Sequence, residues 1–588
     1  MTTLRVMLLA FCIATAPGCT EGPARGEPEL RAEIESLIEA GDLVAAERQA
    51  RRHIAIDPED PSLRLMLGNI YLAAADGPAA FAAFDRAKAL GATTTDVIQG
   101  MAESLILQGE YAEVVELLST TPGGPEIPAS LLKLRLHARL RIPLANPGSV
   151  FLDARSLLAV DAENAVAELE ELAAQQGAIP GNTEHILRAI AYWSCQNAPD
   201  PAEPRDELYQ PSWANRDEAG RRVLVVGPAH ELKTPGAAAR VAKDGDVVEI
   251  QAGTYAGDVA VWEANDLWIR ATGGKVILDS GGATARDMGI WIIRGDRTIV
   301  EGIRFEGARS TGRNGSGIRL LAHNLWVRHS EFHDNEDGLM SFNQPGGEVI
   351  VEHSIFTENG AGDGYSHNIY IGRTDRLIFR FNYSTGARIG HQLKSRAAEN
   401  YILYNRLSDE SSGNSSYTID LPDGGFALVM GNEIQQGPLT VNNHMISLGA
   451  EKPQGREHRF LFSYNTFYNN TSPATFIRDA TRTGVVLVNN VFAGAPAGLD
   501  AATPVRIGNA FSATSDLLDP RRGDYHLKSS ASFIDGGNTP LDDESLDDVS
   551  LEPRYEYVHP AGARARKKIW HRDPGAHEFC GWPEYPAN

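Results

Sequence analysis

A polar position recurs through the second half of the chain at an interval of about 25 residues. Short runs of β-branched and aromatic residues align on Ile303, Ser330, Ser354, Asn382, Asn405, Asn432, Asn465 and Asn490. Three short strands and three turns fill a coil of about this length, and loops lengthen the coil at its corners, so the interval predicts a parallel β-solenoid. We expect the repeated asparagines to stack in an internal amide ladder, which is a structural role.

A second set of runs aligns independently of the first. Its shared apolar positions are Ile318, Leu339, Ile369, Leu393, Ile419 and Ile446. Side chains alternate along a strand, so the neighbours of this inward column are predicted to point outward. On three successive coils these outward residues are Asn368 and Tyr370, then Gln392, Lys394 and Arg396, then Thr418 and Asp420. Since coils are about 4.8 Å apart, Tyr370, Lys394 and Asp420 are expected to form one exposed column.

Segments at both ends of this repeat carry a family resemblance. The entry reads VGPAHELKTPGAAARVAKDGDVVEIQAGTY (226–255), and two closing segments read GDYHLKSSASFIDGG (523–537) and DPGAHEF (573–579). They resemble the right-handed parallel β-helix proteins of the pectate-lyase-like superfamily. The resemblance implies a β-helix over residues 223–540, a cap helix from Pro235 to Ala242 that protects its open end, and a C-terminal tail over 541–588 that packs on the β-helix.

The first part of the chain has a different periodicity. Residues 28–195 are rich in Ala, Leu, Glu and Arg with apolar residues at helical spacing, which predicts helical hairpins. A motif within them resembles the tetratricopeptide pattern in type and spacing: Leu67-Gly68, Tyr71, Ala80, Phe84 and Ala87. We therefore expect a tetratricopeptide-like array over about 28–140 with further helices to 195, then a proline-rich linker over 196–222. Such an array either docks an envelope protein partner or acts as a spacer.

The N-terminus has the features of an export signal. Residues 1–18 contain one early basic residue, Arg5, and an apolar run from Val6 to Ala16 that is too short to span a membrane. The sequence Ala16-Pro17-Gly18-Cys19 resembles the lipobox of bacterial lipoproteins. The resemblance implies cleavage before Cys19, acylation of its thiol, and a tether over 19–27, with ordinary signal cleavage as the alternative. We expect a periplasmic or cell-surface lipoprotein, anchored at the outer membrane and touching membrane only through this lipid.

Two interior cysteines remain after signal cleavage, Cys195 and Cys580. Export would place them in an oxidising compartment, where they either form one long-range disulfide or stay as two buried thiols. The sequence does not decide between these, because it does not bring the two Cα atoms within range.

Charge narrows the choice of partner. The formal net charge of −23 argues against nucleic acid, because phosphate binding requires Lys and Arg to dominate. Residues 373–406 are an exception, with seven Lys and Arg against two acidic residues, a local charge of +5. This stretch predicts an acidic polysaccharide as the partner.

The outward column carries the residue types that β-elimination of a uronate polymer needs. A cation must neutralise the sugar carboxylate, a base must take the acidic proton, and an acid must protonate the leaving oxygen. We predict Lys394 as base, Arg396 as carboxylate ligand, and Tyr370 or His391 as acid. The predicted substrate-binding residues are Asn368, Gln392, Asp420, Arg373 and His367. The structural alternatives are a surface ion pair between Lys394 and Asp420 and a packing role for His367 and His391.

The sequence LKSRA around Lys394 also resembles the catalytic-lysine strand of the chondroitinase-B and alginate-lyase branch of the superfamily. That branch uses calcium, but the Lys394 strand carries no acidic pair, and Asp420 stands where a second catalytic arginine is expected. The cofactor is therefore unknown. Asp363 in GAGDGYSH either ligates calcium or makes a turn.

Together these features predict an α + β chain of two architectures. Its predicted function is that of an exported polysaccharide lyase. The alternatives are a C5-epimerase, which shares the proton abstraction, and a non-catalytic protein that binds exopolysaccharide.

Overall fold

A computed structural model describes residues 27–92, 94–119, 127–144, 148–160, 162–197, 210–214, 217–451, 455–472, 474–503, 505–512, 514–538, 550–567 and 571–582. The predicted signal peptide, its tether with Cys19 and most of the predicted linker lie outside these residues. The chain divides into two compact units, Met1–Ile190 and Ala191–Asn588.

The first unit consists of antiparallel helical hairpins. The helices are α1 (Glu27–Glu39), α2 (Leu43–Ile56), α3 (Pro61–Ala73), α4 (Gly77–Ala89), α5 (Thr94–Gln108), α6 (Tyr111–Ser119), α7 (Ala129–Arg139), α8 (Gly148–Val160), α9 (Ala162–Ala174) and α10 (Pro180–Asn197), whose last turns belong to the second unit. Aspartates cap α2, α3 and α4, whose first backbone N–H groups would otherwise lack acceptors. None of the described helices is long and apolar enough to cross a membrane.

Small residues let neighbouring helices approach closely. A Cβ atom added at Gly68 would lie 2.7 Å from the Phe84 ring, and Gly100 meets the same ring from the next helix. Ala46 and Ala80, the two alanines that the sequence pattern places one repeat apart, are fully buried. The predicted helical hairpins are therefore present, and their tetratricopeptide-like character stays a prediction.

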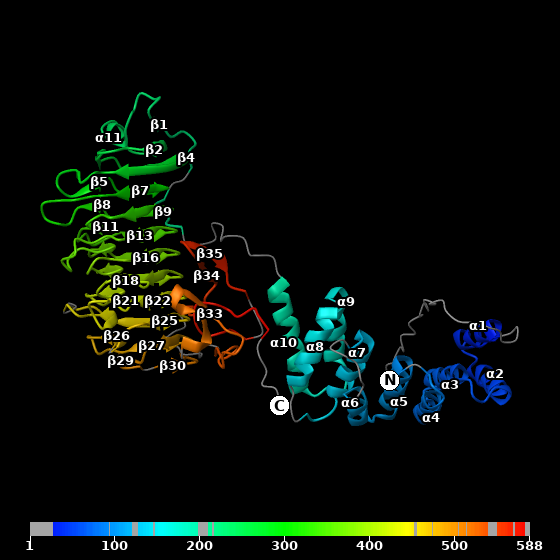
Figure 1. The fold of residues 1–588 in the computed structure, drawn as a ribbon. Helices are drawn as coiled ribbons and strands as arrows, with labels where there is room; N and C mark the ends of the chain where they lie inside the picture. Colours follow the sequence, from blue (N-terminus) through cyan, green and yellow to red (C-terminus); the bar gives the residue numbers. More distant parts are fainter. Residues whose placement is uncertain are drawn as a thin grey trace. The chain divides into compact units, whose positions relative to one another are not determined.

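The second unit is a parallel β-solenoid whose coils stack along one axis (Figure 1). A continuous sheet supplies two strands of most coils: β1 (Val223–Val226), β2 (Val247–Thr254), β4 (Trp268–Asp279), β6 (Thr298–Glu301), β7 (Ile303–Glu306), β9 (Leu325–Arg328), β10 (Glu331–His333), β12 (Glu348–Glu352), β13 (Ile355–Thr357), β15 (Arg376–Arg380), β16 (Tyr383–Thr385), β18 (Glu399–Leu403), β19 (Arg406–Ser408), β21 (Phe426–Met430), β22 (Glu433–Gln436), β24 (Arg459–Ser463), β25 (Thr466–Asn469), β27 (Val485–Val488), β28 (Val491–Gly494), β30 (Val505–Ile507) and β31 (Ala510–Ser512).

A second parallel sheet supplies the remaining strand of each coil. It contains β3 (Ala260–Trp262), β5 (Gly289–Ile293), β8 (Ser316–Leu320), β11 (Asp337–Ser341), β14 (Ile369–Ile371), β17 (Leu393–Ser395), β20 (Ile419–Leu421), β23 (His444–Leu448), β26 (Ala474–Asp479) and β29 (Ala497–Asp500). The short helix α11 (Pro235–Ala239) covers the open end and contributes the fully buried Ala238 to the core. The predicted fold class is confirmed.

Two polar features hold successive coils in register. Each residue of the predicted ladder, from Ser330 to Asn490, accepts a hydrogen bond from the backbone N–H of the ladder residue one coil before it, so the predicted ladder is confirmed. Asn509 extends it by one further coil. Stacked rings fill the interior beside it, including Phe305, Phe332 and Phe356. Every buried polar group in the ladder therefore has a partner.

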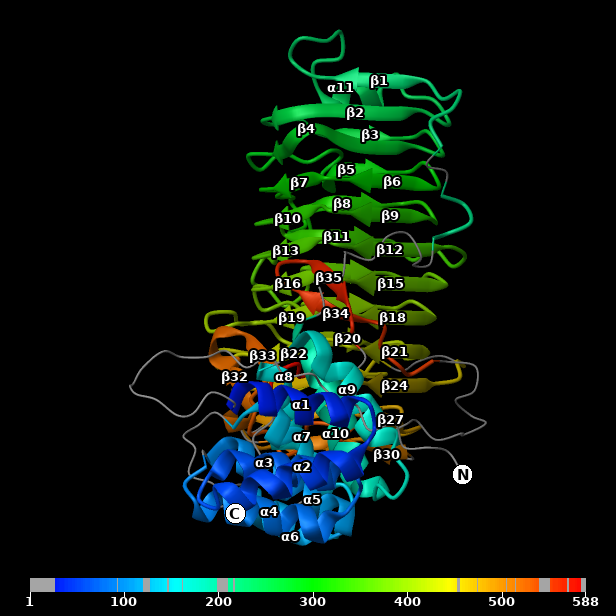
Figure 2. The same cartoon turned by 90° about the vertical axis from the view of Figure 1, so that its right-hand side faces the viewer.

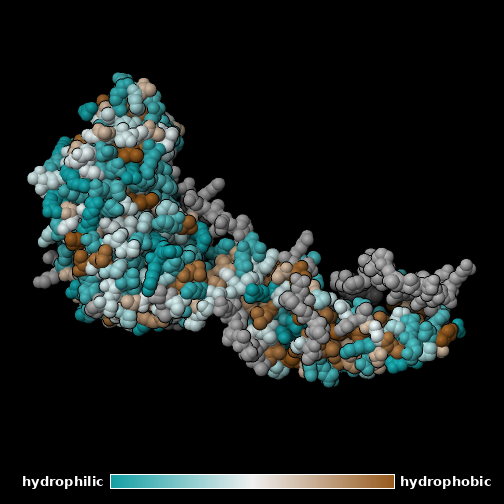
Figure 3. Space-filling model, viewed as in Figure 1, coloured by the Kyte–Doolittle hydropathy of each residue, from teal (hydrophilic) through white to brown (hydrophobic). Residues whose placement is uncertain are grey.

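The chain beyond the solenoid folds back onto its outer surface. It contains the strand pair β32 (Leu517–Asp519) and β33 (Asp524–Leu527) with flanking 3₁₀ turns η1 (Thr514–Asp516) and η2 (Pro520–Arg522), and the hairpin β34 (Tyr555–Val558) and β35 (Gly562–Ala565). Figure 2 shows the hairpin in front of β16 and β19. We refer to residues 514–582 as the C-terminal extension. The view in Figure 3 shows a mostly hydrophilic solenoid face with scattered apolar residues.

Candidate functional site

The predicted column exists on the outer side of the second sheet, but the prediction that it is exposed is wrong, because Asp420 is buried and the Lys394 side chain is only 12% exposed. Tyr370 pairs with Lys394 in register, and Lys394 pairs with Asp420. The intervening inward residues Ile369, Leu393 and Ile419 are fully buried in the solenoid core. The strand alternation deduced from the sequence is therefore correct at these three coils.

Lys394 and Arg396 both point at one carboxylate, that of Glu451. The Lys394 Nζ atom lies 3.1 Å from Glu451 Oε1, and Arg396 Nη2 donates to Oε2 of the same group. Arg396 also donates from Nε to the Tyr370 hydroxyl at 3.0 Å. The side chains of Lys394 and Arg396 are only 12% and 14% exposed, whereas that of Glu451 is 47% exposed. Glu451 thus covers the two cations from the solvent side.

Buried carboxylates support the same cations from below. Asp420 Oδ2 lies 3.3 Å from Lys394 Nζ, and Asp423 accepts from both Arg396 and Arg373. Burial raises the pKa of Asp420, although Lys394 opposes the shift. Burial alone would raise the pKa of Glu451 as well, but hydrogen bonds from Arg396 and Lys394 lower it below its ordinary value.

The two histidines lie beneath the column rather than on its surface. Their rings stack at 4.5 Å, and the Nδ1 atom of each accepts a backbone N–H of the following coil, from His391 to His367 and from Tyr417 to His391. Burial, with a contribution from Lys394, lowers the pKa of His391 to about 3. Both rings are therefore neutral, with one nitrogen used in the fold, and this geometry favours the packing role over acid catalysis.

Asn368 and Gln392 were predicted to point outward, and this orientation is wrong. Both are fully buried, and Thr418, the corresponding residue of the next coil, is buried as well although it was also predicted to point outward. Asn368 accepts from Asn359 and donates to Gln392, which in turn donates to Asp409. They belong to a second interior amide ladder that begins with Asn335. The physical reason is that each residue immediately precedes its strand, so it lies at the coil corner where strand alternation does not apply.

The sequence suggests that residues 373–406 form an uncompensated positive patch. In the structure these positive charges are compensated. All seven of its cations form ion pairs: Arg373–Asp423, Arg376–Glu399, Arg380–Glu352, Arg388–Asp334, Lys394–Asp420, Arg396–Asp423 and Arg406–Glu410. Only Glu399 among these partners comes from the stretch itself. The remaining carboxylates reach it through the coiling of the chain.

The described residues do not fit a calcium site. Among them, no group of three or more His, Cys, Asp and Glu side chains is arranged to hold a metal ion. Asp420, Asp423 and Glu451 lie near one another, but each is paired with Lys or Arg, so their negative charges are already balanced. Asp363 accepts from Tyr365 N and the Ser366 hydroxyl, so it makes the turn that its glycine-rich context predicts.

Sequence reasoning missed Asp423 and Glu451. Asp423 lies two residues after β20 in the sequence LPDGG, a turn whose acidic residue faces the column. Glu451 follows β23 on the next coil, again just after a strand of the second sheet. A search for acidic residues directly after the strands of this sheet would have found both.

Comparisons with known proteins identify a structure of similar fold but no family. No protein-family model matches the chain, and no curated protein matches it. A crystal structure of pectate lyase Pel9A is similar in fold at 13% sequence identity, with a TM-score of 0.43, and the match covers 61% of this chain and 96% of that one. Evidence on function must therefore come from the site itself.

Proposed function

We propose that the protein acts on an acidic, uronate-containing polysaccharide, and that Tyr370, Lys394 and Arg396 carry out β-elimination. One observation carries this proposal. The two cations converge on a single carboxylate, that of Glu451, although its side chain is half exposed and comes from a distant turn. This is the arrangement that a sugar carboxylate needs, since charge-assisted hydrogen bonds to two donors fix both its position and its orientation.

In this mechanism the Glu451 side chain rotates outward and a uronate carboxylate takes its place. The backbone N–H of Glu451 keeps its hydrogen bond to Pro422 O at 3.1 Å, so the main chain stays in place. Arg396 then neutralises the sugar carboxylate, which makes the hydrogen α to it more acidic. Lys394 first helps to position the carboxylate as a cation, and it then passes one ammonium proton to Asp420 Oδ2, 3.3 Å from its Nζ, so that its neutral amine serves as the base.

The remaining steps balance the reaction. Lys394 removes the α-hydrogen, the electron pair forms the new carbon–carbon double bond, and the bond to the glycosidic oxygen breaks. The Tyr370 hydroxyl already accepts a hydrogen bond from Arg396, so its own proton is free to be donated to the leaving oxygen. No step requires a metal ion.

A binding protein without catalysis is the second candidate. It is favoured by the pairing of all seven cations in residues 373–406, because a saturated ion-pair network is stable without substrate. A C5-epimerase differs only in returning the proton to the opposite face, and the experiment below separates it from the other two.

We also propose that the protein is an exported lipoprotein whose helical unit engages an envelope partner. Support comes from the signal-like N-terminus and from the Cys195–Cys580 disulfide, which is typical of proteins in oxidising compartments.

The test compares the wild type with three variants on a panel of uronate polymers, measuring ultraviolet absorbance from unsaturated chain ends and deuterium exchange at C5. Lys394→Ala should reduce the rate by at least about 100-fold, because it removes the base. Glu451→Ala should lower KM roughly tenfold, since substrate no longer competes with an internal carboxylate. Glu457→Ala, an exposed glutamate of the same connection, is the matched control and should leave both constants unchanged.

Exchange at C5 without new absorbance would identify the epimerase. If the polymer binds, Lys394→Ala weakens this binding, and neither absorbance nor exchange is seen, the protein is a non-catalytic binding protein. Activity that survives Lys394→Ala would overturn the site assignment.

A further inference from the structure

The C-terminal extension and the continuous sheet together line an open cavity, which lies on a different strand set from the Lys394 column although the residues of the two interleave in sequence. Its volume is about 440 Å³, within the range of about 300–1,000 Å³ typical of small-molecule sites. One wall comes from the solenoid and the other from residues 522–524, His526, residues 557–559 and Arg564. We call this space the extension cavity.

The solenoid wall is a column of outward side chains on three successive coils. Tyr383 of β16 pairs in register with Arg406 of β19, which pairs with Glu433 of β22. Arg406 donates to both oxygens of Glu410 and contacts Glu433 at 3.4 Å, and its side chain is only 7% exposed. The Tyr383 hydroxyl donates to Glu410 at 3.1 Å. Charged groups at this depth are fixed by their partners, so this wall is preorganised.

The charges around the extension cavity cancel. Arg406 is balanced by Glu410, the buried His577 contacts Glu433 at 2.6 Å, and Arg564 pairs with Glu556 at 2.8 Å. The stacked, positively charged His577 lowers the pKa of His526, so the imidazole that lines the cavity is neutral. The cavity therefore offers many hydrogen-bond donors and acceptors without a net charge that would select an ion.

Aromatic rings supply the apolar part of the lining. The rings of Tyr383 and His559 meet edge to face at 4.8 Å, and the Tyr557 hydroxyl contacts His559 Nδ1 at 3.2 Å. Ring faces next to fixed polar groups suit a ligand with an apolar face and a hydroxylated rim. A hydroxyl both donates and accepts, so it can bond to both members of an ion pair.

We infer that the extension cavity binds a neutral sugar unit of a glycan, held by Tyr383, Glu410 and the Arg406 column on one side and by His526 and Tyr557 on the other. The rim is open to solvent, because the side chains of Arg522 and Asp524 are 88% and 44% exposed. This site is independent of the proposed β-elimination, since none of its lining residues contacts the Lys394 column.

The experiment titrates the full-length protein with free neutral tetrasaccharides of glucose, galactose and mannose, and with tetragalacturonate, by isothermal calorimetry. Val558→Trp places an indole at the cavity wall, where Val558 is 37% exposed. Leu518→Trp adds the same ring at an exposed position of β32 outside the lining and is the matched control. Melting temperatures of both variants establish that they fold.

At least one neutral tetrasaccharide should bind the wild type, with affinity lost at least roughly tenfold in Val558→Trp and unchanged in Leu518→Trp and Lys394→Ala. Tyr383→Phe, which deletes only the hydroxyl bonded to Glu410, should weaken binding severalfold. The inference is overturned if no neutral sugar binds, if Val558→Trp binds as the wild type does, or if tetragalacturonate is preferred at this cavity.

Discussion

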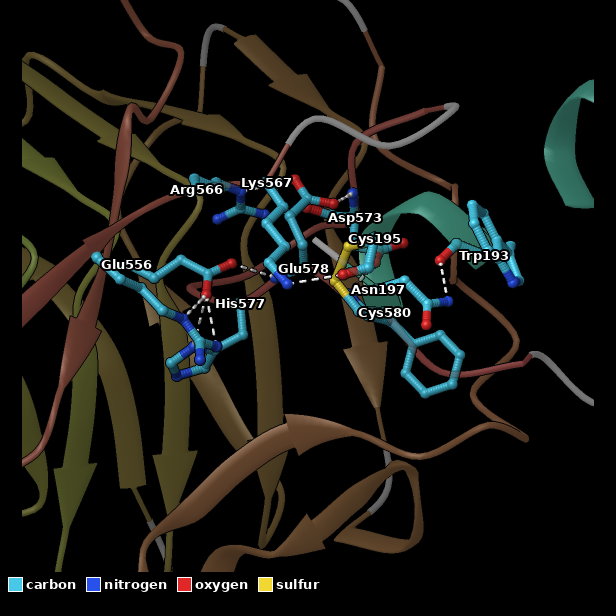
Figure 4. The surroundings of a disulfide bond; sticks show 12 residues. Trp193, Cys195, Asn197, Glu556, Arg566, Lys567, Asp573, His577, Glu578 and Cys580 are labelled. Carbon is cyan, nitrogen blue, oxygen red and sulfur yellow. Dashed lines mark hydrogen bonds and ion pairs between the residues drawn. A yellow bond between two sulfur atoms is a disulfide. The ribbon is translucent and has the colours of Figure 1, made fainter. Parts of the chain in front are cut away.

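His577 is a buried histidine that carries a charge. It lies between the carboxylates of Glu433, 2.6 Å from its Nε2, and Glu556, 3.8 Å from its Nδ1, and Figure 4 shows it facing Glu556. Burial by itself would lower its pKa, but the two carboxylates outweigh burial and raise the pKa to about 9. The imidazolium therefore joins the solenoid, through Glu433, to the C-terminal hairpin, through Glu556.

This shift makes stability depend on pH. A group whose pKa is higher in the folded state stabilises the fold fully below its unfolded pKa of 6.5, and this contribution is lost as pH rises through about 9. We expect the free energy of unfolding to fall by about 3 kcal/mol between these values. The described histidines whose pKa is lowered on folding make stability depend on pH only below 6.5. They therefore do not contribute to the change between pH 6.5 and 9.

Urea unfolding at a series of pH values from 6 to 9.5 measures the slope of the free energy of unfolding against pH. His577→Gln should abolish it, whereas His230→Gln should retain it. Equal slopes in the two variants would show that His577 is not the titrating group.

At the scale of one element, the interior ladder is the feature on which the register of the coils depends. Asn432 accepts the Asn405 backbone N–H at 2.8 Å and donates to Asn465 at 2.9 Å and to Ile402 O at 2.8 Å. It is fully buried, so water cannot replace these partners.

We expect Asn432→Ala to destabilise the solenoid by about 3 kcal/mol, because it leaves the buried Asn405 backbone N–H without its acceptor and removes the side-chain hydrogen bonds to Asn465 and Ile402 O. The measurement is the urea midpoint of the β-sheet circular dichroism signal. Asn470→Ala, at a half-exposed position one coil away, is the control and should shift the midpoint little. A shift of the same size in both variants would contradict a special role for the ladder.

At the scale of the whole molecule, the disulfide closes the longest loop in the second unit. Cys195, in the last turns of α10, bonds to Cys580 in the C-terminal extension, with a Cα–Cα distance of 5.4 Å and a sequence separation of 385 residues (Figure 4). Neighbouring contacts reinforce the junction: Lys567 donates to Cys195 O at 2.7 Å, and the Tyr192 hydroxyl to Asp535 at 3.0 Å. Of the two states left open by the sequence, the structure contains the bonded one.

Cross-linking residues this far apart restricts the unfolded chain strongly, and we expect the Cys195→Ser/Cys580→Ser variant to lose about 2–4 kcal/mol. Thermal unfolding with and without a thiol reductant measures the effect. The wild type should melt lower in reductant, and the variant should be insensitive to it. A wild type that melts at the same temperature in both buffers would contradict this contribution.

The sequence by itself determined the two architectures, the ladder and the Tyr370–Lys394–Asp420 column. It could do so because a solenoid repeats one coil, so residues about 25 apart occupy equivalent places, and side chains alternate within each strand. The sequence did not predict that Asn368 and Gln392 point inward, because they lie at coil corners, where the alternation of side chains along a strand ends.

Only the tertiary structure decided the electrostatics and the cavity. The cations of residues 373–406 look unpaired in the sequence, yet most of their carboxylate partners lie on other coils and turns, as Asp423 and Glu451 do for Arg396. The extension cavity joins Arg406 to residues more than a hundred positions later. Local patterns specify the features that repeat along the chain. Contacts between distant segments depend on where loops and the C-terminal extension fold back onto the solenoid, and the sequence repeat does not contain that information.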